Sequence, residues 1–250
     1  MMEQFNIKRI GSFIYRDIIL LKGAILTTLS VASAIFFIVF LFSLRGDHQI
    51  SSGEFTSIFG KFYVGLGVLF IFSTFKEAHN QKSNHLYFSL PVSSYERIAA
   101  AWLSTFVVYT LVFSFLGFLV GQITIILGSM FSETNFHLLP IFSESYWQLV
   151  KVYFVIQPVF LYGAIAFNKN RVGKTLLVVV LFVFGLVVLN MMLFGMLNYG
   201  YDVFSGEGLA SEAFDKTGQD FSGMGKGFFM GIFVPLMLLA SYFKIVEKEV

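Results

Sequence analysis

Few residues in this sequence have the types and spacing that catalysis requires. A phosphate-binding loop needs the pattern GxxxxGK[ST], but the GKT at 173–175 lacks the upstream glycine and opens an apolar segment. A zinc protease needs HExxH, which is provided by none of the four histidines, His48, His79, His85 and His137. The sequence contains no GxSxG motif and no pair of carboxylates inside an apolar segment. We therefore expect no catalytic residue, no metal site and no cofactor in this chain.

Three amide side chains lie centrally in long apolar segments: Gln122, Gln157 and Asn190. They are candidates for lining a substrate path. Amides in membrane helices also form hydrogen bonds between helices, which is the interpretation we favour for Gln157 and Asn190. No Asp, Glu, Lys or Arg lies at the centre of an apolar segment. Because an ion-coupled carrier usually needs such a buried charge, the sequence favours an external energy source for any transport.

The most distinctive polar stretch comprises residues 76–104, between two apolar segments. We expect helix to continue past the first of these segments through His79. Apolar residues then cluster at Leu86, Tyr87, Phe88 and Leu90. Pro91 disfavours helix just before it, and Ser93 with Glu96 fits a capping box that starts a new helix. Exposed aromatics on a short, capped element suit insertion into a groove on a partner, and insertion into the lipid headgroup layer is the open alternative.

The composition is that of a membrane protein. Hydrophobic residues make up 56% of the sequence and charged residues 13%, whereas a typical soluble domain has about 25% charged residues. Several continuous apolar runs of about 20 residues indicate an all-α polytopic membrane protein, since a β-barrel would show short alternating segments. Cysteine is absent, which excludes a disulfide framework.

Six membrane-spanning helices are expected, at about residues 23–44, 55–75, 98–128, 147–167, 175–197 and 227–243. Residues 1–22 are too charged to span. Their apolar residues recur at helical spacing, which indicates an amphipathic helix lying in the membrane interface. A short lead-in to the first span is the alternative. Residues 23–250 should form a single transmembrane domain.

Two details of the spans can be predicted further. The third span is longer than one crossing needs, so part of it should tilt or extend beyond the bilayer. A re-entrant segment within residues 115–146 would change the number of crossings. In the second span, Gly60, Gly65 and Gly67 are candidates for close helix approach, because small residues let membrane helices pack tightly. The equal alternative is that these glycines are merely tolerated there.

The basic residues predict which ends of the spans face the cytosol. With six spans, the N-terminus, the 76–97 loop, the 168–174 turn and the C-terminal tail share one side. Of the 17 Lys and Arg residues, only five lie on the opposite side: Arg45, Lys61, Lys151, Lys216 and Lys226. Because basic residues favour the cytosolic side, both termini should be cytosolic, and the acidic, glycine-rich 198–226 loop should lie outside.

Two stretches resemble a known family. The segment FKEAHNQKSNHLYFSLPVSSYERIAAAWLST at 75–105 resembles the loop between the second and third spans of type-2 ABC transporter permeases, most closely the small permeases common in Bacteroidetes-type bacteria. The stretch LYGAIAFNKNRVGKTLLVVV at 161–180 is similar to the turn between the fourth and fifth spans of that family. The features shared in the first stretch are Glu77, the Leu90-Pro91 pair, Ser93 with Glu96, and Arg97.

This resemblance implies a permease subunit of an ATP-driven exporter in the bacterial cytoplasmic membrane. In that family two permease copies or paralogues pair, and each docks on a separate ABC ATPase that binds ATP and Mg. The 76–97 loop would be the coupling element, residues 1–22 a connecting helix, and the 198–226 loop a cover over the outer exit. The coupling residues would be Glu77, His79, Leu86, Tyr87, Phe88, Leu90, Pro91, Glu96 and Arg97.

The cargo and two other function classes stay open at this point. The 33 Phe residues suit a hydrophobic or amphipathic cargo, but they suit contact with the lipid bilayer equally well. A non-transporting membrane scaffold or assembly factor would keep the spans and the loop but lack a continuous path between paired subunits. An ion-coupled carrier is the third possibility, and the absence of a central charge disfavours it. No nucleic-acid partner is expected.

Overall fold

The described part of the chain is built from helices alone. The computed structural model describes residues 6–44, 52–80, 84–129, 143–197 and 227–249, and every regular element in these ranges is a helix. The all-α prediction is therefore confirmed. The elements are α1 Ile7–Leu44, α2 Ser52–Thr74, η1 Glu77–His79, α3 Asn84–Phe88, α4 Ser94–Trp102, η2 Leu103–Val108, α5 Tyr109–Ser129, α6 Glu144–Ala166, α7 Arg171–Leu197, η3 Phe229–Phe233 and α9 Val234–Glu249.

Within the described ranges, five helical segments are long and apolar enough to cross a membrane: Ser57–Thr74, Ser94–Ile123, Glu144–Ala166, Arg171–Leu189 and Phe229–Lys248. Helix α1 bends by 59° between its Ile7–Gly23 and Ile25–Val39 parts, and it would add a sixth crossing if the two parts act as one span. The bend lies where the sequence separates the expected interfacial helix from the first span. These helices are compatible with a multi-pass membrane protein, and the count of six spans stays a prediction.

The third expected span is one helical column made of α4, η2 and α5. It begins with the predicted capping box, which is confirmed: the Ser93 hydroxyl accepts from the Glu96 amide, and the Glu96 carboxylate accepts from the Ser93 amide at 3.0 Å. The η2 segment Leu103–Val108 is a π-helix. A π-helical turn leaves backbone groups without their usual partners in the helix, and the Thr105 carbonyl accepts a hydrogen bond from the Tyr153 hydroxyl of α6 at 2.9 Å.

Aromatic rings fill the space between α2, α5 and α6. The buried members of this cluster are Phe59, Tyr63, Tyr109, Phe113, Tyr146 and Tyr153. Glycines on α2 make room for it: a Cβ at Gly67 would lie 2.5 Å from the Tyr153 hydroxyl oxygen, and one at Gly60 would lie 2.9 Å from Leu149. Close helix approach is thus confirmed at Gly60 and Gly67, whereas nothing lies within 4 Å of a Cβ at Gly65.

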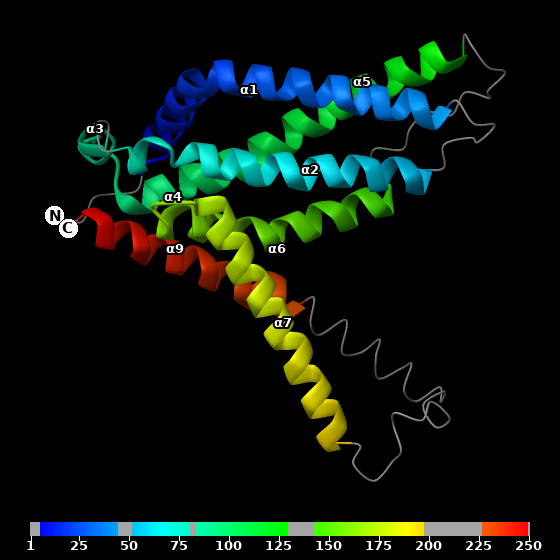
Figure 1. The fold of residues 1–250 in the computed structure, drawn as a ribbon. Helices are drawn as coiled ribbons and strands as arrows, with labels where there is room; N and C mark the ends of the chain where they lie inside the picture. The colour runs from blue at the N-terminus through cyan, green and yellow to red at the C-terminus, as the bar shows by residue number, and fades with distance from the viewer. Residues whose placement is uncertain (1–5, 45–51, 81–83, 130–142, 198–226, 250) are drawn as a thin grey trace.

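Helix α7 departs from the other helices along most of its length (Figure 1). It contacts α6 near its beginning, where Gly163 lies directly against Thr175. Beyond that point its side chains are largely exposed, and only 6% of the Arg171–Leu189 segment is buried within the chain. The apolar surface of α7 is therefore left for lipid or for another protein to cover.

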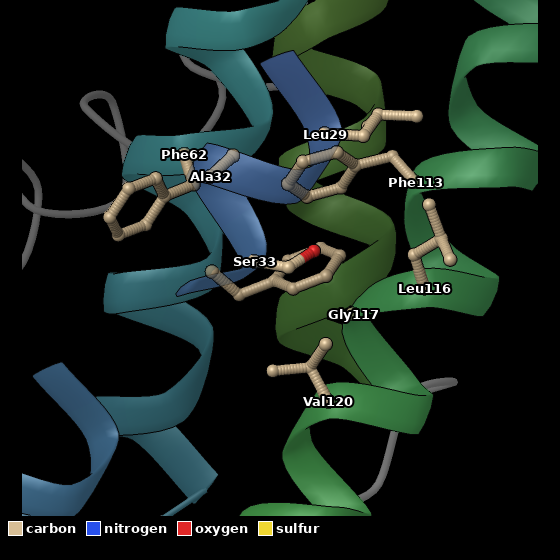
Figure 2. Close-up of a pocket in the computed structure, with 9 residues that line it drawn as sticks. Leu29, Ala32, Ser33, Phe62, Phe113, Leu116, Gly117 and Val120 are labelled. Atoms are coloured by element: carbon tan, nitrogen blue, oxygen red, sulfur yellow. The ribbon is translucent and has the colours of Figure 1, made fainter. Parts of the chain in front are cut away.

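A small pocket lies between α1, α2 and α5, with a cavity volume of about 20 Å³. Figure 2 shows that its walls are almost entirely apolar, with the Ser33 hydroxyl as a polar exception. The lining residues are Leu29, Ala32, Ser33, Phe59, Phe62, Phe113, Leu116, Gly117 and Val120. A cavity of this size holds about one water molecule, so it is no substrate chamber.

Candidate functional site

Four segments that are distant in the sequence meet at one end of the bundle, which we call the junction. They are the start of α1, residues 76–80 together with 84–97, residues 167–171 and the end of α9 (Figure 1). The Asn6 amide donates to the Glu96 carboxylate at 2.8 Å, and Lys248 on α9 donates to the Asn168 side chain at 2.8 Å. The segments that charge counting assigned to one side thus lie together, although the compartment they face stays a prediction.

Helix α1 is bound to the segment after α2 by an ion pair. The Arg16 guanidinium donates to the Glu77 carboxylate at 2.7 Å and to the neighbouring Asp17 carboxylate at 3.1 Å. Both members of the Arg16–Glu77 pair are about one-third exposed, so solvent weakens their attraction. The pair nevertheless fixes the position of Glu77 against α1.

The Glu96 carboxylate is the most deeply buried charge of the junction, with 0% of its surface exposed. Arg9 of α1 lies 2.9 Å from it, and the amides of Asn6 and Ser93 donate to it at 2.8 and 3.0 Å. A buried carboxylate is tolerated only when it is paired and hydrogen-bonded in this way. Glu96 therefore joins the start of α1 to the start of α4.

Arg97 on α4 binds the backbone of the segment that connects α3 to α4. Its side chain is buried, and its guanidinium donates to the carbonyl oxygens of Phe88 at 3.1 Å and Leu90 at 3.3 Å. The same guanidinium lies 5.3 Å from the ring centroids of Tyr87 and Phe88, within the range of cation–π attraction. Residues 84–97 therefore form one compact unit rather than an open loop.

The expectation of exposed aromatics in this unit is wrong for Tyr87. Only 2% of its surface is exposed, its ring lies 6.0 Å from that of Phe13, and Phe88 is half-buried. The reason is that the apolar face of α1, including Phe13, covers the cluster instead of facing only lipid. The exposed residues of 76–80 and 84–97 are Lys76, Asn80, His85, Ser89, Pro91 and Tyr95, while Leu90 is partly buried and the Leu86 side chain lies outside the described residues.

His79 lies between two basic residues. Its Nδ1 lies 2.8 Å from the Phe75 carbonyl oxygen, and its Nε2 lies 3.0 Å from the Lys248 ammonium and 3.3 Å from the Ile165 carbonyl oxygen. Arg171 lies 3.3 Å from the ring. Burial, followed by the nearby charges of Lys248 and Arg171, holds the pKa of His79 below its ordinary value, although its hydrogen bond to Phe75 opposes the shift. The imidazole is therefore neutral at physiological pH.

The three amide side chains within the expected spans differ in burial and in hydrogen bonding. Gln157 is fully buried and donates to the Thr105 hydroxyl at 2.7 Å, which confirms a hydrogen bond between α6 and η2. Gln122 on α5 is half-buried, and the Asn190 side chain lies outside the described residues. A path-lining role for any of the three stays a prediction.

Sequence reasoning missed the α1 partners of the predicted coupling residues. Arg9 and Arg16 are seven positions apart, two helical turns, and so lie on the same side of α1 as the buried Phe13. That spacing was the available signal for a pair of arginines directed at the loop. Within the described ranges, no three His, Asp or Glu side chains are placed to hold a metal ion.

The chain was also compared with known proteins. No protein-family model, no curated protein and no solved structure matches it.

Proposed function

We propose that this chain is the transmembrane permease subunit of an ATP-driven ABC exporter in the bacterial cytoplasmic membrane. The junction would be the surface on which a separate ATPase docks, with both termini in the cytosol. The cargo would be hydrophobic or amphipathic. ATP and Mg would be bound by the ATPase and not by this chain, and a second permease copy or paralogue would complete the transporter.

The observation that carries the proposal is how residues 76–80 and 84–97 are held in place. The segment is polar and short, yet it is locked by the buried Arg97 and Glu96 and bound to α1 at two points, Arg9–Glu96 and Arg16–Glu77. A coupling element must transmit displacement rather than absorb it. A unit whose buried Glu96 is ion-paired and hydrogen-bonded, and whose buried Arg97 is held by two carbonyl oxygens, has few alternative arrangements, so a push on its exposed side moves it as a body.

The contacts give two routes for such a displacement. One runs through Arg9 and Arg16 into α1. The other runs from the Glu96-capped start of α4 along the continuous α4–η2–α5 column into the interior. A partner shifts the conformation only by binding one arrangement more tightly than the other, so an ATPase that prefers one position of the 84–97 unit would bias both helices together.

The first test is purification of the tagged full chain in a mild detergent, with mass spectrometry and an ATPase assay on the eluate. The proposal expects a co-eluting protein with a phosphate-binding loop and vanadate-sensitive ATP hydrolysis. Recovery of the chain with only non-ATPase proteins would favour the membrane scaffold. Recovery with no partner from native membranes would leave the docking proposal without support and count against it.

The second test changes the exposed side of the 76–97 segment. Replacing His85 by Ala removes an exposed group without opening the buried ion pairs, and should lower the recovered ATPase about tenfold. Lys151→Ala, at the opposite end of α6, is the matched control and should leave recovery unchanged. Equal recovery from all three chains would exclude this surface as the docking site.

A further inference from the structure

The two halves of the junction differ in how their positive charges are balanced. In the half formed by α1 and α4, Arg9 is paired with Glu96 and Arg16 with Glu77 and Asp17. In the half formed by η1, α7 and α9, the basic side chains donate to uncharged acceptors instead of carboxylates. The first half provides an internal reference for how this protein balances a partly buried cation.

Arg171 and Lys248 are both half-buried and are held by neutral acceptors. Arg171 donates to the Phe75 carbonyl at 3.2 Å and Lys248 donates to the Asn168 side chain at 2.8 Å, while both lie against the neutral ring of His79. Within the described ranges neither forms an ion pair with a carboxylate. Of the two acids that flank Lys248, Glu247 is bound instead by Lys244 at 2.6 Å, and the Glu249 side chain lies outside the described residues. Among the described side chains, two positive charges are thus brought together without a counter-charge.

Two further lysines extend this basic surface to the solvent side. Lys169 and Lys174 are exposed and flank Arg171. The chain turns sharply at Asn170, which adopts a φ of 49°, and α7 starts at the next residue. The unpaired amides at the start of this 27-residue helix add partial positive charge to the same place. We call Lys169, Arg171, Lys174 and Lys248 the basic corner.

An uncovered apolar surface adjoins the basic corner along α7. Between Leu176 and Leu189 the side chains of α7 are apolar and nearly all exposed, with Leu177 at 59%, Val180 at 63% and Leu181 at 60%. Charge and apolar surface therefore follow each other in the direction of the helix axis. This order matches an amphiphile with an anionic head and long hydrocarbon chains.

We propose that the basic corner binds the headgroup phosphate of an anionic phospholipid whose acyl chains lie along α7. Arg171 and Lys248 would contact the phosphate, and Lys169 and Lys174 would add attraction at longer range. A soluble phosphate or an acidic peptide would leave the α7 surface unused, and a zwitterionic lipid brings its own cation into the corner. The site requires only that α7 crosses the bilayer, and it does not depend on the transport proposal.

Native mass spectrometry of the full chain in detergent tests this site, with phosphatidylglycerol and phosphatidylcholine of the same acyl chains as probes. We expect the wild type to retain phosphatidylglycerol preferentially. A basic residue near an anionic lipid surface contributes about a fivefold gain in binding, so the double substitution R171Q/K248Q should reduce that preference about 25-fold. The matched control is K61Q/K151Q, which removes two positive charges on α2 and α6 at the opposite end of the bundle.

A second variant keeps the proposal testable if R171Q/K248Q does not fold. K169Q/K174Q changes only exposed side chains and should reduce the preference while the chain still elutes as a single species. Equal retention of both lipids by the wild type would overturn the proposal, as would a preference that survives in both basic-corner variants or falls equally in the control. Displacement of phosphatidylglycerol by millimolar inorganic phosphate would also overturn it, because the site would then recognise phosphate without the lipid.

Discussion

Arg9 on α1 and Glu96 on α4 form an ion pair of 2.9 Å in which the arginine is one-third exposed and the glutamate is completely buried. The carboxylate cannot turn to water if the arginine is lost. The pair therefore connects the amphipathic start of the chain to the start of a membrane-spanning column by a contact that neither helix can replace by itself.

The first prediction concerns this pair. Arg9→Gln should lower the free energy of unfolding by about 2 kcal/mol, since a buried charged group loses one of its hydrogen-bonded partners while keeping those from Asn6 and Ser93. Thermal unfolding in detergent measures the loss. Combining it with Glu96→Gln should recover part of the loss, because the charge left unpaired is then gone. If the two substitutions lower stability additively, Arg9 and Glu96 are not energetically coupled.

The second prediction concerns Tyr87. Tyr87→Ser should lower the free energy of unfolding by about 3 kcal/mol, because it leaves a cavity between Phe13 and the Arg97 guanidinium. Tyr87→Phe keeps the ring and should cost much less. Urea or thermal unfolding of the three chains distinguishes this buried role from a docking role. A Tyr87→Ser chain as stable as the wild type would mean that Tyr87 is not part of the core.

The third prediction compares two glycines on α2. Gly67→Ala should destabilise the protein by about 1–3 kcal/mol, because the new Cβ meets the Tyr153 hydroxyl and the ring cluster must shift. Gly65→Ala is a matched control on the same helix, where nothing lies within 4 Å of the new atom, and it should be neutral or slightly stabilising. Thermal unfolding of both variants decides the matter, and equal effects would contradict the packing described here.

The fourth prediction separates packing from transport at Gln157. Gln157→Leu removes one hydrogen bond to Thr105, and such bonds between membrane helices are worth about 0.6 kcal/mol on average. The free energy of unfolding should therefore change by less than about 1 kcal/mol. Loss of cargo transport in reconstituted vesicles without loss of stability would identify Gln157 as part of a path. Loss of both together would assign it to packing alone.

The fifth prediction is a pH dependence of the junction. The pKa of His79 is lowered in the folded chain, so below the ordinary histidine value of 6.5 the unfolded chain binds the proton more readily and stability falls as pH falls. Protonation would also place two cations, His79 and Lys248, face to face. Unfolding measured between about pH 7.5 and pH 5.5 should show this loss. Lys248→Gln should make the loss smaller, since it removes one of the charges that oppose protonation.

Local rules in the sequence predicted several elements correctly. The capping box at Ser93 and Glu96 and the close approaches at Gly60 and Gly67 are confirmed because each depends on residues a few positions apart or on the small size of one residue. The helical class follows from the apolar runs alone. The hydrogen bond from Gln157 follows because a buried amide in a membrane helix needs a partner.

Long-range pairing was beyond the sequence. An amphipathic helix such as the start of α1 buries its apolar face equally well against lipid headgroups or against protein, and the pattern alone does not choose. The structure places Phe13 against Tyr87, so one aromatic of the expected docking surface belongs to the core. Likewise, nothing in the sequence specified that Arg16 pairs with Glu77 after 60 intervening residues.

The π-helical turn at Leu103–Val108 holds one residue more than an α-helical turn would, and it absorbs that residue locally while α4 and α5 stay in one column. Removing one residue there would return the turn to ordinary α-helix and leave Tyr109 and Phe113 facing the aromatic cluster, while the Thr105 carbonyl would return to its own helix instead of accepting from Tyr153. The same deletion between Tyr109 and Phe113, where the helix is already α, would rotate every later residue by about 100° and turn Phe113 away from the cluster. Single-residue deletion scanning along the column should therefore find the π-helical turn more tolerant than the first turns of α5.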